Sequence, residues 1–325
     1  MPFTASSVIP YGLSVMYSMD IYRQRTCPPS PFTMPPTPSG GGTLIGFVMG
    51  TDTIVIGHPA PNAALIGGLT TTVCYGTVIR RGPAEVVVAL RGTDGFAEWA
   101  EDGEFILTPY IPADPLAPAP PGVQVELGFF GIYRSLVLAD VHGAVIGPLA
   151  TKLPGFLGPD DKVPDTKVIV AGHSLGGPLA TYLTLDLARG PLRDRVSGCY
   201  FASPHPGNQA FAALFDQVVG PNYVVYNYLL DIVPRVPPTE FGYSALSAVQ
   251  VIQPATAQAD IKLGIACNHH VVCYLAMLDY AATMAALKPV PAGEEGSVKC
   301  IRGPQTDKPT LAKSLVSRIL EVAGQ

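Results

Sequence analysis

A serine flanked by glycines is the residue of this chain whose setting best suits covalent chemistry. Residues 168–177 read VIVAGHSLGG, where a β-branched run typical of a buried strand leads into Gly-x-Ser-x-Gly, and the next residues predict a helix over 178–187. With 34 glycines in 325 residues the five-residue pattern alone would mean little, but this strand and helix are typical of a nucleophile elbow. Such a turn holds the serine at an unusual backbone angle and exposes its hydroxyl to a base. The sequence therefore indicates Ser174 as a nucleophile rather than an ordinary surface serine.

A nucleophilic serine needs a histidine base and a carboxylate that orients the histidine, usually in the chain order Ser, Asp or Glu, His. Three histidines follow Ser174, namely His205, His269 and His270. His205 comes directly after a predicted strand and precedes the expected acid. The adjacent pair opens an apolar helix and is therefore preferred, but residue chemistry alone does not separate its two members.

The acid is predicted at Asp231. It follows the apolar run YVVYNYLL and precedes IVPRVPP, whose prolines end the strand and stiffen the loop. Sites on parallel sheets form at the carboxyl ends of strands, which favours this position. The alternative reading is an acid in a surface turn. Other carboxylates after the serine have weaker claims, because they fall on predicted helices or in a loop: Asp186, Asp216 and Asp260.

The elements that must position these residues alternate between strand and helix. Apolar runs predict strands over 43–49, 53–56, 72–79 and 86–90, and again over 167–171, 198–202 and 223–229. The first group suits antiparallel pairing, and the second alternates with helices as in a parallel sheet. Helices are expected over 14–25, 129–153 and 311–322, and Pro- and Gly-rich loops over 28–42 and 111–122. We predict one α/β domain spanning residues 1–325, with a mixed, mainly parallel central sheet covered by helices on both faces.

Composition narrows the class of protein. The chain is 48% hydrophobic and 14% charged with a formal net charge of −5, so a large core is expected and a nucleic-acid partner is not. The longest apolar segment, residues 270–287, is interrupted by Asp279 and predicts a core helix rather than a transmembrane segment. The first residues show no signal peptide, which fits a cytoplasmic protein or a mature secreted form with an added Met1. The oligomeric state stays open.

The six cysteines form no Cys-x-x-Cys pair, so neither a metal site nor a redox motif is expected, and we expect no cofactor. Their even number permits disulfides. Buried free thiols are the preferred interpretation in a chain of this size.

Four blocks, in order, give the chain a resemblance to a known family. They are VVVALRGTDGFAEWAED, VELGFFGIY, VAGHSLGGPLA with ASPHPGNQAF behind it, and NYLLDIVPRVPP followed by NHHVVCYLAML. Together they resemble the class 3 lipases, which include fungal triacylglycerol lipases, feruloyl esterases and bacterial relatives. The resemblance implies an α/β-hydrolase fold and ester hydrolysis.

The resemblance also implies roles for residues. Ser174 would be the nucleophile, Asp231 the acid and His269 the base, because Asn268-His269 with Tyr274-Leu275 keeps the family spacing N-H-x4-Y-L. Thr93, in the family's R-G-[ST], and the N–H of Leu175 would form the oxyanion hole.

A lid is implied near residues 94–104. Phe96 and Trp99 would face the cleft or lipid, although Trp99 could equally be a core anchor. Asp102 occupies the position of an acid that holds the Thr93 hydroxyl, or is a surface charge at the lid hinge. Five carboxylates in or beside this segment oppose contact with oil and predict a preference for short to medium acyl esters: Asp94, Glu98, Glu101, Asp102 and Glu104.

Three departures from the family pattern affect the substrate pocket rather than the triad. Glu126 stands where the family usually has His, His205 stands where it has Arg, and Asn227 lies one residue further from the acid than is common.

Three functions follow from these features. The first is a serine lipase or esterase that acts through an acyl-enzyme and makes transient contact with a lipid interface. The second keeps the fold and mechanism but hydrolyses feruloyl esters, polyesters, phospholipids or thioesters. The third, a non-catalytic binding protein on the same fold, is disfavoured because every member of the triad is present. A serine peptidase is disfavoured because the ordered blocks are those of lipases.

Overall fold

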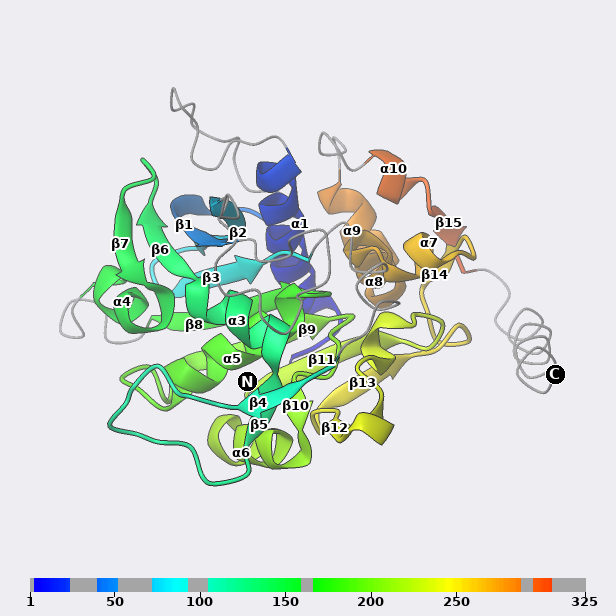
Figure 1. The fold of residues 1–325 in the computed structure, drawn as a ribbon. Coiled ribbons are helices and arrows are strands. Elements are labelled where there is room, and N and C mark those ends of the chain that lie inside the picture. The colour runs from blue at the N-terminus through cyan, green and yellow to red at the C-terminus, as the bar shows by residue number, and fades with distance from the viewer. Residues whose placement is uncertain are drawn as a thin grey trace.

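The computed structural model describes residues 3–23, 40–51, 72–92, 105–158, 166–287 and 295–305. A nine-stranded sheet runs through its centre in the order β13-β11-β9-β8-β3-β2-β1-β6-β7 (Figure 1). The strands β3, β8, β9, β11 and β13 are parallel neighbours, and the pairs from β3 through β2, β1 and β6 to β7 are antiparallel. Only β2 and β6 therefore run against the other seven strands, and the sheet is mixed, as predicted from the sequence.

The strands of this sheet are β1 (Thr43–Thr51), β2 (Thr72–Arg80), β3 (Glu85–Leu90), β6 (Val137–Asp140), β7 (Val145–Pro148), β8 (Lys167–His173), β9 (Val196–Phe201), β11 (Tyr223–Tyr228) and β13 (Val249–Ile252). A four-stranded sheet contains β4 (Leu107–Pro109), β5 (Gln124–Glu126), β10 (Gly207–Asn208) and β12 (Tyr243–Ser244). The strands β14 (Ala259–Ile261) and β15 (Ile301–Pro304) form an antiparallel pair.

The α-helices are α1 (Ile9–Arg23), α3 (Leu127–Ser135), α4 (Leu149–Phe156), α5 (Gly176–Ala188), α6 (Gln209–Val219), α7 (Ile265–His269), α8 (Val271–Leu278), α9 (Tyr280–Ala286) and α10 (Glu295–Val298). Short 3-10 helices occur at η1 (Ser6–Val8), η2 (Val233–Arg235) and η3 (Thr239–Phe241).

The inner strands β1, β2, β3, β8, β9 and β11 are buried on both faces, which explains why they are nearly continuous apolar runs. Alternate residues of a strand point to opposite faces. In β8, Val168 and Val170 pack with α3, α5 and α6, whereas Ile169 and Ala171 pack with α1 and α8. Figure 1 shows α1 and α8 on one side of the sheet and α5 and α6 on the other.

The predicted helix over 129–153 is wrong in its middle. The helix α3 stops at Ser135, and β6 and β7 follow as an antiparallel pair before α4 begins. Asp140 explains the turn between these strands, since its carboxylate accepts hydrogen bonds from the N–H groups of His142 and Ala144, each at 2.9 Å. Such a local bond competes with helix formation, and Gly143 supplies the positive φ of 82° that the turn needs.

Four predicted segments lie wholly or mostly outside the described residues. They are the strand over 53–56, most of the loop over 28–42, the lid over 94–104 and the helix over 311–322. Residues 111–122 are described and contain turns but neither helix nor strand.

The prediction that the cysteines are buried free thiols is wrong for Cys74, Cys267 and Cys300. Cys267 and Cys300 form a disulfide with a Cα–Cα distance of 5.4 Å, and Cys74 is also disulfide-bonded. Cys199 and Cys273 are buried free thiols. A cysteine's spacing along the chain does not reveal its partner, because the pairing depends on elements brought together by the fold.

No helix in the described ranges is long and apolar enough to cross a membrane. The predicted apolar helix over 270–287 is instead divided into α8 and α9 at Asp279, which caps α9 by accepting a hydrogen bond from the N–H of Ala282 at 2.9 Å.

Candidate active site

Ser174 lies in a turn between β8 and α5, at the carboxyl end of a parallel strand. Its φ is 57°, which is uncommon for a residue other than glycine. Two hydrogen bonds hold this conformation: its N–H donates to the carbonyl of Phe201 at 3.1 Å, and its carbonyl accepts from the N–H of Gly177 at 2.8 Å. The strained angle expected from the sequence is therefore present.

Glycine is required where strand and helix meet around this turn. A Cβ added at Gly172 would lie 2.1 Å from the carbonyl oxygen of Gly176, and one added at Gly176 would lie 2.3 Å from the carbonyl oxygen of Leu90. Both distances are far below van der Waals contact. The two glycines of Gly-x-Ser-x-Gly thus permit the close approach that raises Ser174 above the end of the sheet.

Three side chains from distant parts of the sequence form a hydrogen-bonded relay. The Nε2 atom of His269 lies 2.8 Å from the hydroxyl oxygen of Ser174, and its Nδ1 atom lies 2.8 Å from the Oδ2 atom of Asp231. An ionised carboxylate only accepts hydrogen bonds, so Nδ1 carries the proton and Nε2 is free to accept one from the serine hydroxyl. This is the arrangement in which a histidine removes a proton from a nucleophilic serine.

Asp231 follows β11 and is 2% exposed. Its Oδ1 atom accepts from the N–H of Val233 at 3.0 Å, and its Oδ2 atom accepts from the hydroxyl of Tyr274 at 2.8 Å as well as from His269. The Tyr274 hydroxyl in turn accepts from the N–H of Tyr228 at 2.9 Å. Three donors compensate the carboxylate for the water it lacks and fix its orientation.

His269 ends α7, and the residues around it hold that helix in place. Asn268 donates from its side-chain amide to the carbonyl of Leu230 at 3.0 Å, which joins the histidine segment to the loop of Asp231. His173 donates from Nε2 to the carbonyl of His269 at 2.6 Å. Burial, followed by the charge of His269, holds the pKa of His173 well below its usual value, so His173 is a neutral donor.

The other histidine and carboxylate candidates predicted from the sequence have hydrogen-bond partners outside the relay or lie beside it. His270 is the residue between α7 and α8, and it is the ring of His269 that is hydrogen-bonded to Ser174 and to Asp231. Asp186 accepts from the hydroxyls of Tyr110 and Tyr133. Asp216 accepts from the Tyr223 hydroxyl, and Asp260 pairs with Arg302.

Leu175, predicted to donate to an oxyanion, directly follows Ser174 in the turn. Its N–H belongs to the residue after the nucleophile, at the N-terminus of the 13-residue helix α5, and has no hydrogen-bond acceptor within the described ranges. The positive end of the helix dipole also favours negative charge there. This N–H could therefore stabilise a developing oxyanion beside Ser174.

Arg91 holds the segment that leads to Thr93. Its guanidinium is buried and donates to the carbonyls of Cys74 and Gly92, each at 2.6 Å. Gly92 packs directly against the nucleophile, because a Cβ there would lie 2.8 Å from the Cβ of Ser174. The chain thus passes beside Ser174 immediately before Thr93. Four residues predicted to act at the site lie outside the described residues: Thr93, Phe96, Trp99 and Asp102.

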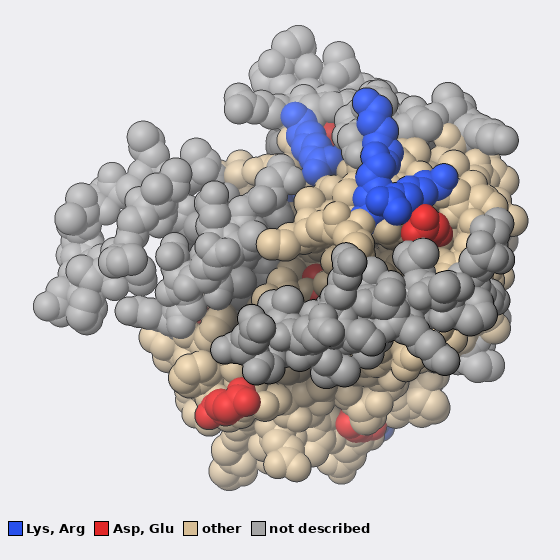
Figure 2. Space-filling view, turned by 90° about the vertical axis from the view of Figure 1, so that its right-hand side faces the viewer, with Lys and Arg blue, Asp and Glu red and all other residues tan. Residues whose placement is uncertain are grey.

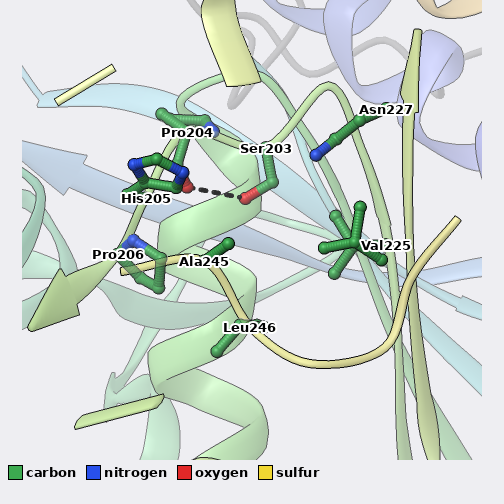
Figure 3. Close-up of a pocket in the computed structure, with 9 residues that line it drawn as sticks. Ser203, Pro204, His205, Pro206, Val225, Asn227, Ala245 and Leu246 are labelled. Atoms are coloured by element: carbon green, nitrogen blue, oxygen red, sulfur yellow. Dashed lines mark hydrogen bonds between the residues drawn. The ribbon is translucent and has the colours of Figure 1, made fainter. Parts of the chain in front are cut away.

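A small pocket follows the end of β9 at Ser203 and is lined by none of the three relay residues (Figure 3). His205 lines it and lies within hydrogen-bonding distance of the Pro237 carbonyl, 2.8 Å from its Nδ1 atom, while burial lowers the pKa of this histidine. Figure 3 shows the side chain of Asn227 pointing towards Ser203 across the pocket. Two of the departures from the family pattern, His205 and Asn227, thus line the same pocket.

Glu126, the third departure, has a structural partner instead. It caps α3, its Oε2 atom accepting from the N–H of Phe129 at 2.6 Å, and it is 2% exposed. Burial raises its pKa to about 7, and the hydrogen bonds from the N–H groups of Phe129 and Gly128 act in the opposite direction.

Sequence reasoning missed two residues that contact the relay. Tyr274 was used only to mark a spacing, although its hydroxyl reaches Asp231. His173 was an unassigned position of Gly-x-Ser-x-Gly, although it contacts His269. Neither contact is a pattern in the sequence, because each joins residues at least 43 positions apart.

Comparison with known proteins shows similarity to lipases and phospholipases. Residues 87–241 match the family described as Lipase (class 3). Phospholipase A1-II 3 of Oryza sativa subsp. japonica is 26% identical over 242 residues, which cover 67% of this chain and 56% of the relative. A lipase of Rhizomucor miehei is 28% identical over 231 residues, covering 65% of this chain and 56% of the relative. The chain thus spans little more than half the length of these relatives.

A solved structure supports the fold. The lipase from Rhizopus microsporus var. chinensis aligns with 78% of this chain and 76% of its own at a TM-score of 0.53 and 24% identity. The likeness extends over most of both chains and concerns their α/β architecture. It agrees with the central mixed sheet and the helices on both of its faces.

Proposed function

We propose that this chain, which belongs to the class 3 lipase family and has the α/β-hydrolase fold, is a serine carboxylic-ester hydrolase of the lipase and esterase type. The observation that carries the proposal is the relay in which Ser174, His269 and Asp231 are joined by two hydrogen bonds of 2.8 Å. In this proposal Ser174 is the nucleophile, His269 the base and Asp231 the carboxylate that orients it.

The reaction proceeds in two steps. His269 accepts the hydroxyl proton while the Ser174 oxygen attacks the ester carbonyl, and the tetrahedral oxyanion forms beside the N–H of Leu175. Collapse of this intermediate breaks the bond to the alcohol, which leaves with the proton held by His269. Water then attacks the acyl-enzyme by the same route and releases the carboxylic acid. Thr93 supplies the second oxyanion donor by its family position, and the path of Gly92 beside Ser174 supports this role.

The Ser174→Ala variant tests the proposal, with p-nitrophenyl butyrate as a soluble substrate. Removal of the nucleophile from a relay that acts as a unit lowers turnover by about a million-fold. The far-ultraviolet circular dichroism and melting temperature of the variant are expected to stay close to those of the parent. Retention of more than a trace of turnover in the purified variant would assign the chemistry to another residue.

Phospholipid acyl esters are a second candidate substrate class. The similarity to a rice phospholipase A1 over 67% of this chain favours them. Transient contact with a lipid interface belongs to both substrate classes. A panel of p-nitrophenyl butyrate and palmitate, emulsified triglyceride and phosphatidylglycerol vesicles separates the candidates by the rate of acid release. The acidic residues near 94–104 favour the shorter acyl ester over the emulsified fat.

A further inference from the structure

Five consecutive exposed residues, 262–266, run from the end of β14 into α7, the helix that carries His269. Two of them are large and apolar: Leu263 is 56% exposed and Ile265 is 70% exposed. Ile232, next to Asp231, is 59% exposed. The two segments adjoin, because Asn268 donates to the carbonyl of Leu230 at 3.0 Å. Exposed apolar side chains thus lie on the two segments that carry Asp231 and His269.

Cationic side chains accompany these apolar residues. Lys262, Lys299 and Arg302 are exposed on β14, β15 and their adjoining residues, and the N–H of Lys262 donates to the carbonyl of Cys300 at 2.8 Å. Figure 2 faces this side of the molecule and shows Lys and Arg side chains gathered in its upper part with an acidic group beside them. Asp260 lies 3.8 Å from Arg302 and offsets one of the three charges.

The net charge of this cluster is opposite in sign to the net charge of the whole chain. The whole chain carries a formal net charge of −5, so the cations on β14 and β15 are a local feature rather than a reflection of composition. The loop that contains Asp231 also places a cation near an exposed apolar side chain, because exposed Arg235 lies three residues after Ile232. Exposed apolar side chains beside cations suit a surface that offers both acyl chains and anionic headgroups.

We propose that residues 262–266, with Lys299 and Arg302, form a docking surface for an anionic phospholipid bilayer. Leu263 and Ile265 enter the boundary between headgroups and acyl chains, while Lys262, Lys299 and Arg302 contact lipid phosphates. Because Ile265 begins the five-residue helix that ends at His269, docking brings this histidine close to the membrane. This surface rests on the proposed function for its purpose, but its binding to lipid is independent of catalysis.

Vesicle sedimentation of the Ser174→Ala protein tests the docking surface without hydrolysis of the lipid. Binding to phosphatidylcholine–phosphatidylglycerol vesicles is expected to exceed binding to phosphatidylcholine alone and to weaken as salt is added. Adding Lys262→Glu and Arg302→Glu is expected to lower the partition coefficient by at least about 25-fold, since each basic residue near an anionic membrane contributes about five-fold. Leu263→Ser with Ile265→Ser is expected to weaken binding even at low salt.

A matched control has the same change in net charge elsewhere. Lys152 lies on α4 near the opposite edge of the sheet, and Arg193 lies in the loop that enters β9; both are exposed. Lys152→Glu with Arg193→Glu is expected to retain most of the binding. Equal losses in the two double variants, equal binding to neutral and anionic vesicles, or no vesicle binding would each overturn the docking surface. Competition by inorganic phosphate at matched ionic strength would instead identify an anion site and also overturn it.

These outcomes are separate from the test of the proposed function. Hydrolysis of p-nitrophenyl butyrate by the chain with Ser174 intact needs no membrane. If the protein is catalytically active but does not bind anionic vesicles, only the docking surface is refuted. If it binds the vesicles but shows no turnover, only the proposed function is refuted.

Discussion

The imidazole rings of His173 and His269 lie against each other, with their centroids 4.7 Å apart and their planes inclined by 38°. The Nε2 atom of His173 also lies 2.6 Å from the carbonyl oxygen of His269. One neutral histidine therefore contacts both the ring and the backbone of the proposed base. Because it is adjacent to Ser174, it ties the nucleophile's turn to the segment that carries the base.

This relationship predicts that His173→Phe lowers kcat for p-nitrophenyl butyrate by about five- to ten-fold, because one hydrogen bond of about 1 kcal/mol that positions His269 is lost. Phenylalanine keeps a ring against His269 but lacks the N–H. KM is expected to change little, since His173 positions the base rather than the substrate. His142→Phe, at an exposed histidine of the β6–β7 turn, serves as the control. A change in KM with kcat preserved would show that His173 contacts substrate instead.

The adjacent histidines differ in their expected importance. His269→Ala is predicted to reduce turnover about as much as loss of the serine, about a million-fold, because the relay acts as a unit. His270→Ala is predicted to lower turnover only a few-fold, since the ring of His269 takes part in both hydrogen bonds of the relay. Single-turnover measurements on p-nitrophenyl butyrate compare the two. The reverse order of effects would make His270 the base.

Local patterns predicted the parts of the fold that depend on local physics. The strand and helix around Ser174 follow from a β-branched run, two glycines and an apolar helix, and the structure has them at β8 and α5. Asp231 was predicted from the end of a strand, and it lies at the end of β11. The distinction between His269 and His270 required the family spacing, because neighbouring residues on a chain have almost the same pattern around them.

Contacts between distant segments could not be predicted from the sequence. The apolar residues over 129–153 fit a helix by period, but pairing of β6 with β1 overrides that preference. The pairing of Cys267 with Cys300 depends on the fold, which brings the residue before β15 next to α7 although the two cysteines are 33 positions apart in the sequence. The cap made by Glu126 depends on a turn that a lone acidic residue does not reveal.

Glu126 predicts a pH dependence of stability. Its pKa is raised from 4.5 to about 7 in the folded protein by burial. Between these values the unfolded chain has lost the proton and the native protein keeps it, so this group's contribution to stability is present below pH 4.5 and falls as pH rises towards 7. The loss is on the order of 3 kcal/mol. Glu126→Gln keeps the acceptor for the N–H of Phe129 but cannot ionise.

Urea unfolding of parent and Glu126→Gln proteins at a series of pH values checks this prediction. The free energy of unfolding of the variant is expected to rise relative to that of the parent as pH increases from 4.5 to 7 and to level off above it. Taking the difference between the two proteins removes the contributions of the other titrating groups. A difference that is constant over this range would mean that the carboxyl ionises as it does in water.

The disulfide between Cys267 and Cys300 is predicted to stabilise the segment of the base. Cys267 lies in α7, two residues before His269, and the bond joins this five-residue helix to Cys300, the residue directly before β15. So short a helix is marginal without external support. By the loop-entropy relation, a crosslink over this separation contributes about 3 to 4 kcal/mol.

The double variant Cys267→Ser with Cys300→Ser is therefore expected to melt about 5 to 10 °C below the parent. At 25 °C, well below either transition, kcat for p-nitrophenyl butyrate is also expected to fall, because α7 no longer holds His269 firmly against Ser174. Treatment with a dithiol reduces the disulfide to two thiols and should reproduce the loss in the parent. Cys74 is also disulfide-bonded, so the same treatment of the double variant measures the effect of that second bond alone. If the double variant keeps the parent's kcat but melts at a lower temperature, the Cys267–Cys300 bond contributes only to global stability. If both kcat and the melting temperature are unchanged, neighbouring packing alone fixes α7.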